Sequence, residues 1–109
     1  MPASRAELQT DARGRDVLVV AGDIDLANAH DLVTTATPLL SRQQEHALVL
    51  DLAGVTFLDS TGIGALLEIR TLALAEGRRT EVVAMSEAVE RVLELAGLTD
   101  LFAPEEDPA

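Results

Sequence analysis

Two patterns of apolar residues alternate along the chain: short continuous runs, and longer stretches with apolar residues three or four positions apart. Continuous runs rich in β-branched residues are typical of buried strands, and such runs lie at 17–21, 47–52 and 80–85. Residues 6–10 are predicted to form a further strand that pairs with the first run through a polar turn at 11–14. The pattern therefore indicates a sheet that begins with a hairpin.

The first stretch with helical spacing follows the first core strand and spans residues 27–40. Asp25 or Asn28 can cap its amino-terminal end. Pro38 has no backbone N–H to donate, so it is expected to end or kink this helix near Thr37. The apolar positions expected to face the core are Ala29, Leu32, Val33 and Ala36.

Two further helices are predicted in the second half of the chain. One spans 61–76 and is closed by Gly77, and the other runs from its N-cap, Ser86, to Gly97. The segment 98–102 is expected to pack back onto the domain. The apolar stripes on these helices are Ile63, Leu66, Leu67 and Leu74 on the earlier helix and Val89, Val92, Leu93 and Ala96 on the later one. Most of these positions are predicted to lie in the core, and Ile63, beside Ser60, is alternatively an exposed contact for a partner.

Strands that alternate with helices indicate an α/β domain with parallel neighbouring strands. We expect a mixed sheet of four to five strands with three to four helices. A chain of 109 residues buries roughly 65% of its unfolded surface around one core, which predicts a single domain. That domain is expected to span residues 1–103, and the acidic, proline-containing residues 104–109 are expected to form a frayed tail.

Charge and composition exclude several classes of function. Nineteen acidic and eight basic side chains give a net charge of −11, which opposes binding to nucleic acid and to anionic membranes. All the basic residues are arginine, and without lysine a Walker A loop, a protein-kinase core and Schiff-base chemistry are excluded in their usual forms. The lack of cysteine removes disulfides and thiolate sites. We therefore expect neither a nucleic-acid partner nor a membrane partner.

The amino-terminal residues bear on location. Residues 1–7 contain no apolar core of a secretory signal, and the longest apolar run, 17–21, is far shorter than the ~20 residues of a membrane span. A cytoplasmic location is expected.

The segment with the most informative chemistry is Leu-Asp-Ser-Thr-Gly-Ile-Gly at 58–64, where a loop that leaves a strand enters a helix. Such a segment can be a plain helix cap, with Asp59 or Ser60 as the acceptor. However, Gly62 and Gly64 each cost ~0.8–1 kcal/mol relative to alanine inside a helix, and they suit a site where another chain or a phosphate approaches the backbone. With Ser60 as N-cap, a phosphate on its hydroxyl would meet the positive end of the helix dipole.

Other candidate residues point to chemistry less clearly. Asp23 and Asp25 are predicted to lie in the loop after the first core strand, where they could serve general acid–base catalysis or a metal, or Asp25 could simply cap the next helix. His30 and His46 lack metal-ligand spacing and are expected to be solvated. Asp51, near a strand end, resembles a phosphoacceptor aspartate, but the required lysine is missing. No metal site and no cofactor is expected.

The chain resembles the STAS domain of bacterial anti-sigma factor antagonists over nearly its whole length. The resemblance lies in Val-Val-Ala-Gly-Asp-Ile-Asp at 19–25, in 48–67 with the Asp-Ser-Thr-Gly-Ile-Gly motif, and in the V-x-x-V-L-E-L-A-G-L-x-D-L-F pattern at 89–102. It implies a binding protein rather than an enzyme, with Ser60 phosphorylated by an anti-sigma factor that is a serine kinase. The unphosphorylated form would bind that kinase and free the sigma factor, and the phosphorylated form would not. A serine phosphatase is the implied second partner.

The resemblance also suggests which residues meet the partner. Asp25 matches the loop aspartate of the family, Asp59, Thr61 and Gly62 match its motif, and Asp23 and an exposed Ile63 extend the predicted surface. Two features depart from the family pattern: Pro38 falls inside the first helix, and no arginine or lysine is expected near Ser60. Two other functions stay open, a STAS accessory subunit of a lipid or anion transport complex and a small hydrolase that uses Asp23 and Asp25.

Overall fold

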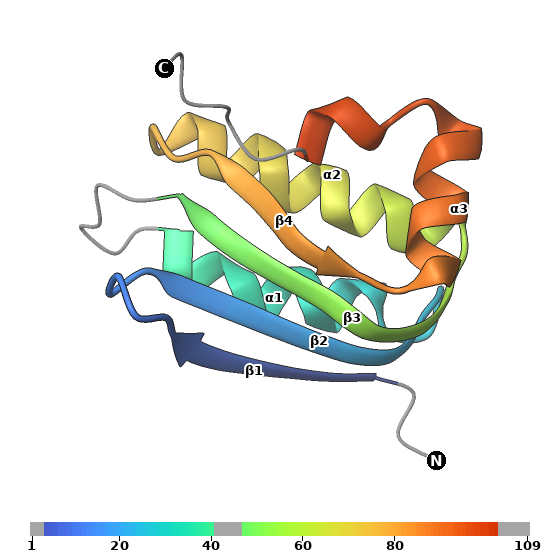
Figure 1. Cartoon of the computed structure of the whole chain (residues 1–109), viewed down its shortest axis with the longest axis horizontal. Helices are drawn as coiled ribbons and strands as arrows, with labels where there is room; N and C mark the ends of the chain where they lie inside the picture. The colour runs from blue at the N-terminus through green and yellow to red at the C-terminus, as the bar shows by residue number, and fades with distance from the viewer. Residues whose placement is uncertain (1–3, 41–46, 103–109) are drawn as a thin grey trace.

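The structure is a computed structural model that describes residues 4–40 and 47–102. Within these ranges the chain forms an α/β domain with four strands, three α-helices and one 3-10 helix, as the alternating pattern predicts (Figure 1). The strands are β1 (Ser4–Thr10), β2 (Asp16–Ile24), β3 (Leu48–Leu58) and β4 (Thr80–Met85). The helices are α1 (Ala29–Leu40), α2 (Ser60–Ala75), α3 (Glu87–Ala96) and the 3-10 helix η1 (Thr99–Phe102).

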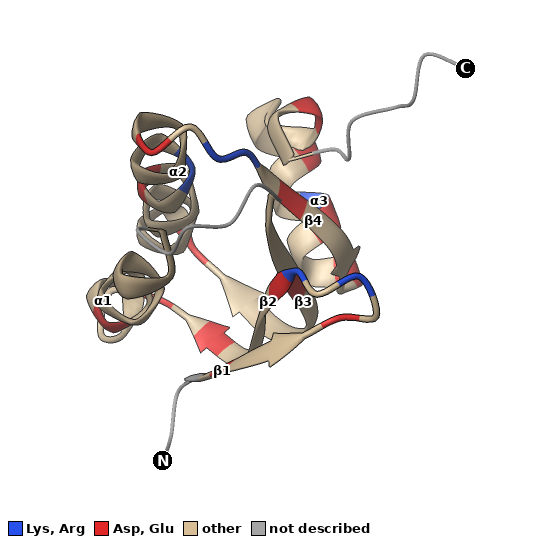
Figure 2. Cartoon of the chain, turned by 90° about the vertical axis from the view of Figure 1, so that its left-hand side faces the viewer, with Lys and Arg blue, Asp and Glu red and all other residues tan. Residues whose placement is uncertain are grey.

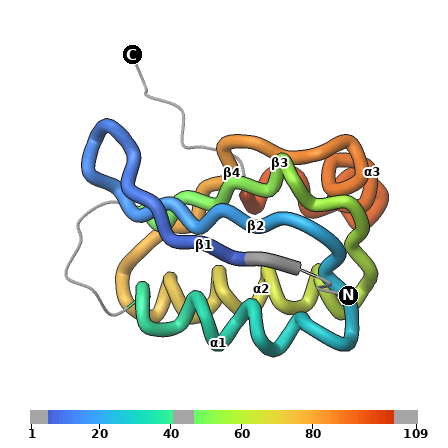
Figure 3. Tube along the Cα trace, turned by 90° about the horizontal axis from the view of Figure 1, so that it is seen from below, coloured from blue at the N-terminus to red at the C-terminus, as the bar shows by residue number. Residues whose placement is uncertain are grey.

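The strands lie in the order β1-β2-β3-β4. β1 is antiparallel to β2, which confirms the predicted hairpin, while β3 is parallel to both of its neighbours. Helices α1 and α2 lie side by side against one face of the sheet, and α3 lies on the other side (Figures 2 and 3). This topology places the carboxyl ends of β2, β3 and β4 at one edge, where α2 begins.

The core lies between the sheet and its helices. Leu18 and Val20 of β2 and the alternating Leu48, Leu50 and Leu52 of β3 are all at most 1% exposed. They share one apolar cluster with the helical positions predicted to be buried, including Leu32 of α1, Leu66 of α2 and Leu93 of α3. Burial of each side chain of this size contributes about 1.5–3 kcal/mol to folding. Because the cluster includes residues of β2, β3 and α2, this packing holds α2 against the sheet.

Strand β3 is longer than the apolar pattern predicts. The sequence suggests a loop at 53–58, but the strand continues to Leu58, and β2 likewise continues through Asp23 to Ile24. The pairing continues because the ladder shifts register twice, between Val19 and Ala21 and between Gly22 and Asp23. These irregularities break the simple alternation that marks a strand. The loop placement of Asp23 is therefore wrong.

Helix α1 does not end at Thr37, so of the two outcomes expected for Pro38, an end or a kink, the first is wrong. It runs through the proline to Leu40. Leu39 and Leu40 are buried in the core cluster, and the Thr37 hydroxyl donates to the carbonyl of Val33 at 2.8 Å. Burial of the two leucines offsets the backbone hydrogen bond that the proline cannot make.

The last helix follows its predicted caps closely. The Ser86 hydroxyl accepts the Val89 N–H at 3.2 Å, and Gly97 adopts the left-handed conformation, with φ 72°, that ends a helix. Phe102 is 1% exposed, so the closing segment packs back as expected. Two core predictions are wrong, since Ala96 and Leu74 are exposed.

Several predictions fall on residues outside the described ranges. They concern His46, the limit of the domain at residue 103 and the acidic tail at 104–109. Within the described part of the chain, no helix is both long and apolar enough to cross a membrane.

Candidate functional site

A single residue, Asp59, separates the end of β3 from the start of α2, and it is the helix N-cap. Asp59 has an extended backbone, with φ −101° and ψ −174°, and its Oδ1 accepts the N–H of Gly62 at 2.9 Å. The sequence leaves Asp59 and Ser60 open as the capping residue; the structure selects Asp59, so the alternative with Ser60 as N-cap is wrong. The carboxylate of Asp59 accepts one of the first-turn N–H groups that have no partner within the helix. Asp59 is therefore the capping residue, and Ser60 is the first helical residue.

Ser60 is exposed, whereas the adjacent Thr61 is half-buried. Among the described residues, no side-chain hydrogen bond engages the Ser60 hydroxyl. The hydroxyl thus projects at the positive end of a 16-residue helix without taking part in its capping. An accessible, uncommitted hydroxyl is what a modifying enzyme requires.

The two glycines of the motif have different surroundings. Gly62 is buried, and a Cβ placed there would lie 2.6 Å from the carbonyl oxygen of Ile24 and 2.5 Å from Cδ1 of Leu58. Gly64 is exposed, with nothing within 4 Å of a Cβ. The close backbone approach that the sequence suggests therefore occurs at Gly62, and the approaching chain is the domain's own β2.

The two predicted carboxylates, Asp23 near the end of β2 and Asp25 in the turn before α1, both make structural hydrogen bonds. Asp23 Oδ1 accepts the Thr56 hydroxyl at 2.6 Å, and Asp25 Oδ1 accepts the N–H of Ala27 at 3.0 Å. Asn28 Oδ1 accepts the Asp25 N–H at 2.9 Å, so the side chains of Asp25 and Asn28 each cap a backbone N–H of this turn. Within the described ranges, no cluster of three or more acidic or histidine side chains could hold a metal.

A backbone hydrogen bond joins this turn to the start of α2. The N–H of Asp59 donates to the carbonyl of Ile24 at 3.3 Å. The segment that contains Asp23 and Asp25 and the segment that contains Asp59, Thr61 and the half-buried Ile63 are consequently neighbours at the carboxyl ends of the parallel strands (Figure 1). The structure thus brings the predicted site residues to one end of the molecule.

Exposed apolar side chains accompany this end of the molecule. Leu26, in the turn before α1, is 79% exposed, and Phe57, next to the last residue of β3, is 49% exposed. The sequence pattern predicts neither as a contact residue, although both lie within two residues of a predicted site residue. Apolar groups beside polar ones are typical of the centre of a protein interface.

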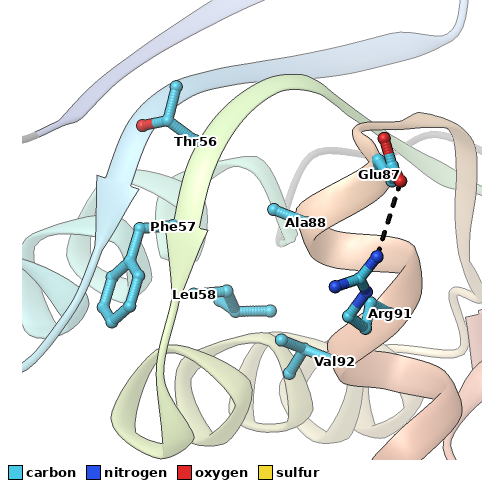
Figure 4. A pocket seen from close by; sticks show the side chains of 7 residues that line it. All are labelled: Thr56, Phe57, Leu58, Glu87, Ala88, Arg91 and Val92. Carbon is cyan, nitrogen blue, oxygen red and sulfur yellow. Dashed lines mark ion pairs between the residues drawn. The ribbon is translucent and has the colours of Figure 1, made fainter.

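A pocket of about 460 Å³ opens beside the site, between β3 and α3 (Figure 4). Its apolar lining includes Phe57 and Leu58, and Arg91 of α3 pairs with Glu87 at 3.5 Å along its wall. Arg91 therefore lines the same cavity as Leu58. The sequence does not predict this arrangement, because Leu58 and Arg91 are far apart in the chain.

Three other arginines lie at the opposite end of the sheet. Arg15, Arg78 and Arg79 form ion pairs there with acidic side chains (Figure 2).

This chain is similar to known proteins in sequence and in structure. A model of the STAS domain matches residues 7–108. The chain belongs to the STAS domain family. Among solved structures, an anti-sigma factor antagonist from Mycobacterium paratuberculosis is 30% identical, with a TM-score of 0.77 over 94% of this chain and 86% of that one. An anti-sigma-B factor antagonist of Staphylococcus epidermidis is 25% identical over 83 residues, 76% of each chain.

Other STAS structures share the fold at lower identity. SpoIIAA in its unphosphorylated form is 18% identical, with a TM-score of 0.74 over 95% of this chain and 90% of that one. The murine anion transporter Slc26a9 is 15% identical, with a TM-score of 0.64 over 96% of this STAS domain but only 21% of the transporter chain. The fold alone therefore does not separate regulators from transporter domains, and the surroundings of Ser60 must carry the functional argument.

Proposed function

We propose that this STAS domain is an anti-sigma factor antagonist whose binding is switched by phosphorylation of Ser60. In its unphosphorylated form it binds an anti-sigma factor that is a serine kinase, and the sigma factor is released. The observation that carries the proposal is the exposed, uncommitted hydroxyl of Ser60 at the first position of α2. The names of the Mycobacterium and Staphylococcus relatives support the same role.

The local geometry suits phosphoryl transfer. A kinase needs the attacking oxygen accessible and in line with the γ-phosphoryl group of its ATP. Ser60 Oγ meets the first requirement, and in the transfer it gives up its proton and forms the new bond to phosphorus while ADP leaves. The product phosphate lies at the positive end of the α2 dipole, which favours it by about 0.3–1 kcal/mol, so the domain stays folded.

The same phosphate disrupts partner binding. It adds about 1.5–2 negative charges in the region that already contains Asp59 and, across the Ile24 hydrogen bond, Asp25. A partner surface that fits a neutral hydroxyl would have to bury this charge without a counter-ion, at a cost of several kcal/mol. A serine phosphatase that removes the phosphate restores binding.

The partner-binding surface in this proposal surrounds Ser60. Asp23, Asp25, Asp59, Thr61 and Ile63 form its polar and apolar rim, and the exposed Leu26 and Phe57 add apolar anchors. Gly62 is buried, so its contribution is to seat the first turn of α2 against Ile24 rather than to touch the partner. The protein acts by binding, in the bacterial cytoplasm where sigma factors work, and catalyses no reaction of its own.

The direct test is to incubate the protein with Mg-ATP and the candidate anti-sigma kinases of its own genome. We expect one of them to add a single phosphate per chain and a serine phosphatase to remove it. Failure of every such kinase to modify the protein would contradict the proposal. Turnover of an ester, peptide or nucleotide by the protein alone, abolished in Asp23→Ala or Asp25→Ala, would favour a hydrolase instead.

A further inference from the structure

Asn28 is a buried polar side chain beside the site, only 7% exposed, and both ends of its amide are hydrogen-bonded. Its Nδ2 donates to the carbonyl of Asp23 at 2.7 Å, and its Oδ1 accepts the N–H of Asp25 at 2.9 Å. Because one partner is an acceptor and the other a donor, only one orientation of the amide satisfies both. A buried amide with both groups satisfied holds its two partners in a fixed geometry.

The two hydrogen bonds of Asn28 fix the peptide units on either side of Ile24. The N–H of Asp25 and the C=O of Ile24 belong to the same planar peptide unit, and in a trans peptide they point in opposite directions. When Asn28 holds that N–H, it also sets the direction of the Ile24 carbonyl. This carbonyl is directed toward the start of α2.

The first turn of α2 packs against the Ile24 carbonyl. This carbonyl accepts the Asp59 N–H at 3.3 Å, and it lies 2.6 Å from where a Cβ of Gly62 would be. Asp59 and Gly62 flank Ser60 and Thr61 in the sequence, so both sides of the Ser60 segment rest on one carbonyl. A rotation of the Ile24–Asp25 peptide would therefore displace the Ser60 hydroxyl.

We propose that Asn28 is a positioning residue for Ser60. It acts through the Ile24–Asp25 peptide to hold the first turn of α2 in the geometry that the kinase and the binding partner recognise. The proposal rests on the proposed function for its consequence, since positioning matters to a switch only if Ser60 is phosphorylated. Displacing a reacting atom by about 1 Å can lower a rate by on the order of 100-fold, which makes the effect measurable.

The test compares Asn28→Ala and Asn28→Asp with a matched control, Asp11→Ala. Asn28→Asp keeps the side-chain size and the acceptor for Asp25 but loses the donor to Asp23. Asp11 accepts the backbone N–H groups of Arg13 and Arg15 in the hairpin turn, at the other end of the sheet, so its loss also removes a side-chain clamp on a turn. The readouts are the amide resonances of Asp59, Ser60 and Thr61 by NMR, and kcat and KM for phosphorylation by the anti-sigma kinase.

We expect Asn28→Ala to shift the three amide resonances and to lower kcat/KM by about 10-fold or more, with no loss in Asp11→Ala. In Asn28→Asp a carboxylate oxygen would face the Asp23 carbonyl at the buried position where Nδ2 now donates, so we expect a loss at least as large as in Asn28→Ala. Unchanged resonances, or a loss of kcat/KM as large in the control, would overturn the positioning role. So would unfolding of both Asn28 variants, because Asn28 would then hold the whole domain rather than the site. If the unsubstituted protein is not phosphorylated, the proposed function fails, and the resonances still decide whether Asn28 positions Ser60.

Discussion

Ser60 and Thr61 are adjacent hydroxyl residues, yet their positions on α2 differ in ways that matter for phosphorylation. Ser60 is exposed at the first helical position, whereas Thr61 is half-buried, and its β-branched side chain is restricted about χ1. We therefore predict phosphate on Ser60 alone, in one-to-one stoichiometry. Tandem mass spectrometry of the kinase-treated protein checks this, with Thr61→Val as the variant that should still be labelled. Substantial phosphate on Thr61, or labelling that survives in Ser60→Ala, would contradict the assignment.

Gly62 and Gly64 provide a matched pair of substitutions within one helical turn. Gly62→Ala should destabilise the domain by roughly 1–3 kcal/mol, because the new methyl group would overlap the Ile24 carbonyl, which Asn28 holds in place. Gly64→Ala meets open space and should stabilise it by about 1 kcal/mol through helix propensity. Urea denaturation of both variants measures the difference. Equal stabilities would mean that the first turn of α2 is not seated on Ile24.

At the scale of elements, Pro38 is the clearest conflict between local preference and packing. The helix continues past it because Leu39 and Leu40 are buried. Replacing it with alanine restores a backbone donor in α1 without disturbing those leucines. Pro38→Ala should raise the free energy of unfolding, by up to about 3 kcal/mol. Thermal denaturation provides the measurement, and a lower melting temperature than that of the unsubstituted protein would show that the proline ring itself is needed in the packing.

The elements also show what could be read from the sequence and what could not. Strand and helix order, the hairpin and the caps Ser86 and Gly97 were predictable, because apolar period and capping chemistry are local. The continuation of β3 to Leu58 was not, since the register shifts that sustain the pairing depend on contacts with β2. The sequence leaves the N-cap open between Asp59 and Ser60 because both are good capping residues, and only the geometry of the strand end selects the first.

The candidate site was predictable to a similar degree. The motif pointed to Ser60, and the parallel topology brought Asp23 and Asp25 to the same end of the sheet as Asp59. The sequence does not predict the exposure of Leu26 or the pocket that Phe57 and Arg91 line. Exposure and contacts between distant segments leave no periodic signal in the sequence. The sequence offers Asn28 as one of two possible caps, but it does not predict the hydrogen bond from the Asn28 amide to the Asp23 carbonyl.

At the scale of the whole molecule, the proposal requires that phosphorylation change the surface and leave the fold intact. The phosphate would lie on the exposed side chain of the first residue of α2. We predict that phosphorylated protein keeps the far-UV circular dichroism of the unmodified form and that its free energy of unfolding differs by no more than about 1 kcal/mol. Loss of helical signal or of cooperative unfolding on phosphorylation would show that the switch works by unfolding instead.

The most direct test of the switch is the affinity of four forms of the protein for the cognate anti-sigma kinase, measured by titration calorimetry. Unmodified protein and Ser60→Ala should bind alike, because both present a small neutral side chain at the start of α2. Phosphorylated protein and Ser60→Asp should bind on the order of 100-fold more weakly or worse, since an unpaired charge buried in the interface costs several kcal/mol. Equal affinity of Ser60→Ala and Ser60→Asp, together with unchanged affinity after phosphorylation, would contradict the claim that charge at position 60 controls binding.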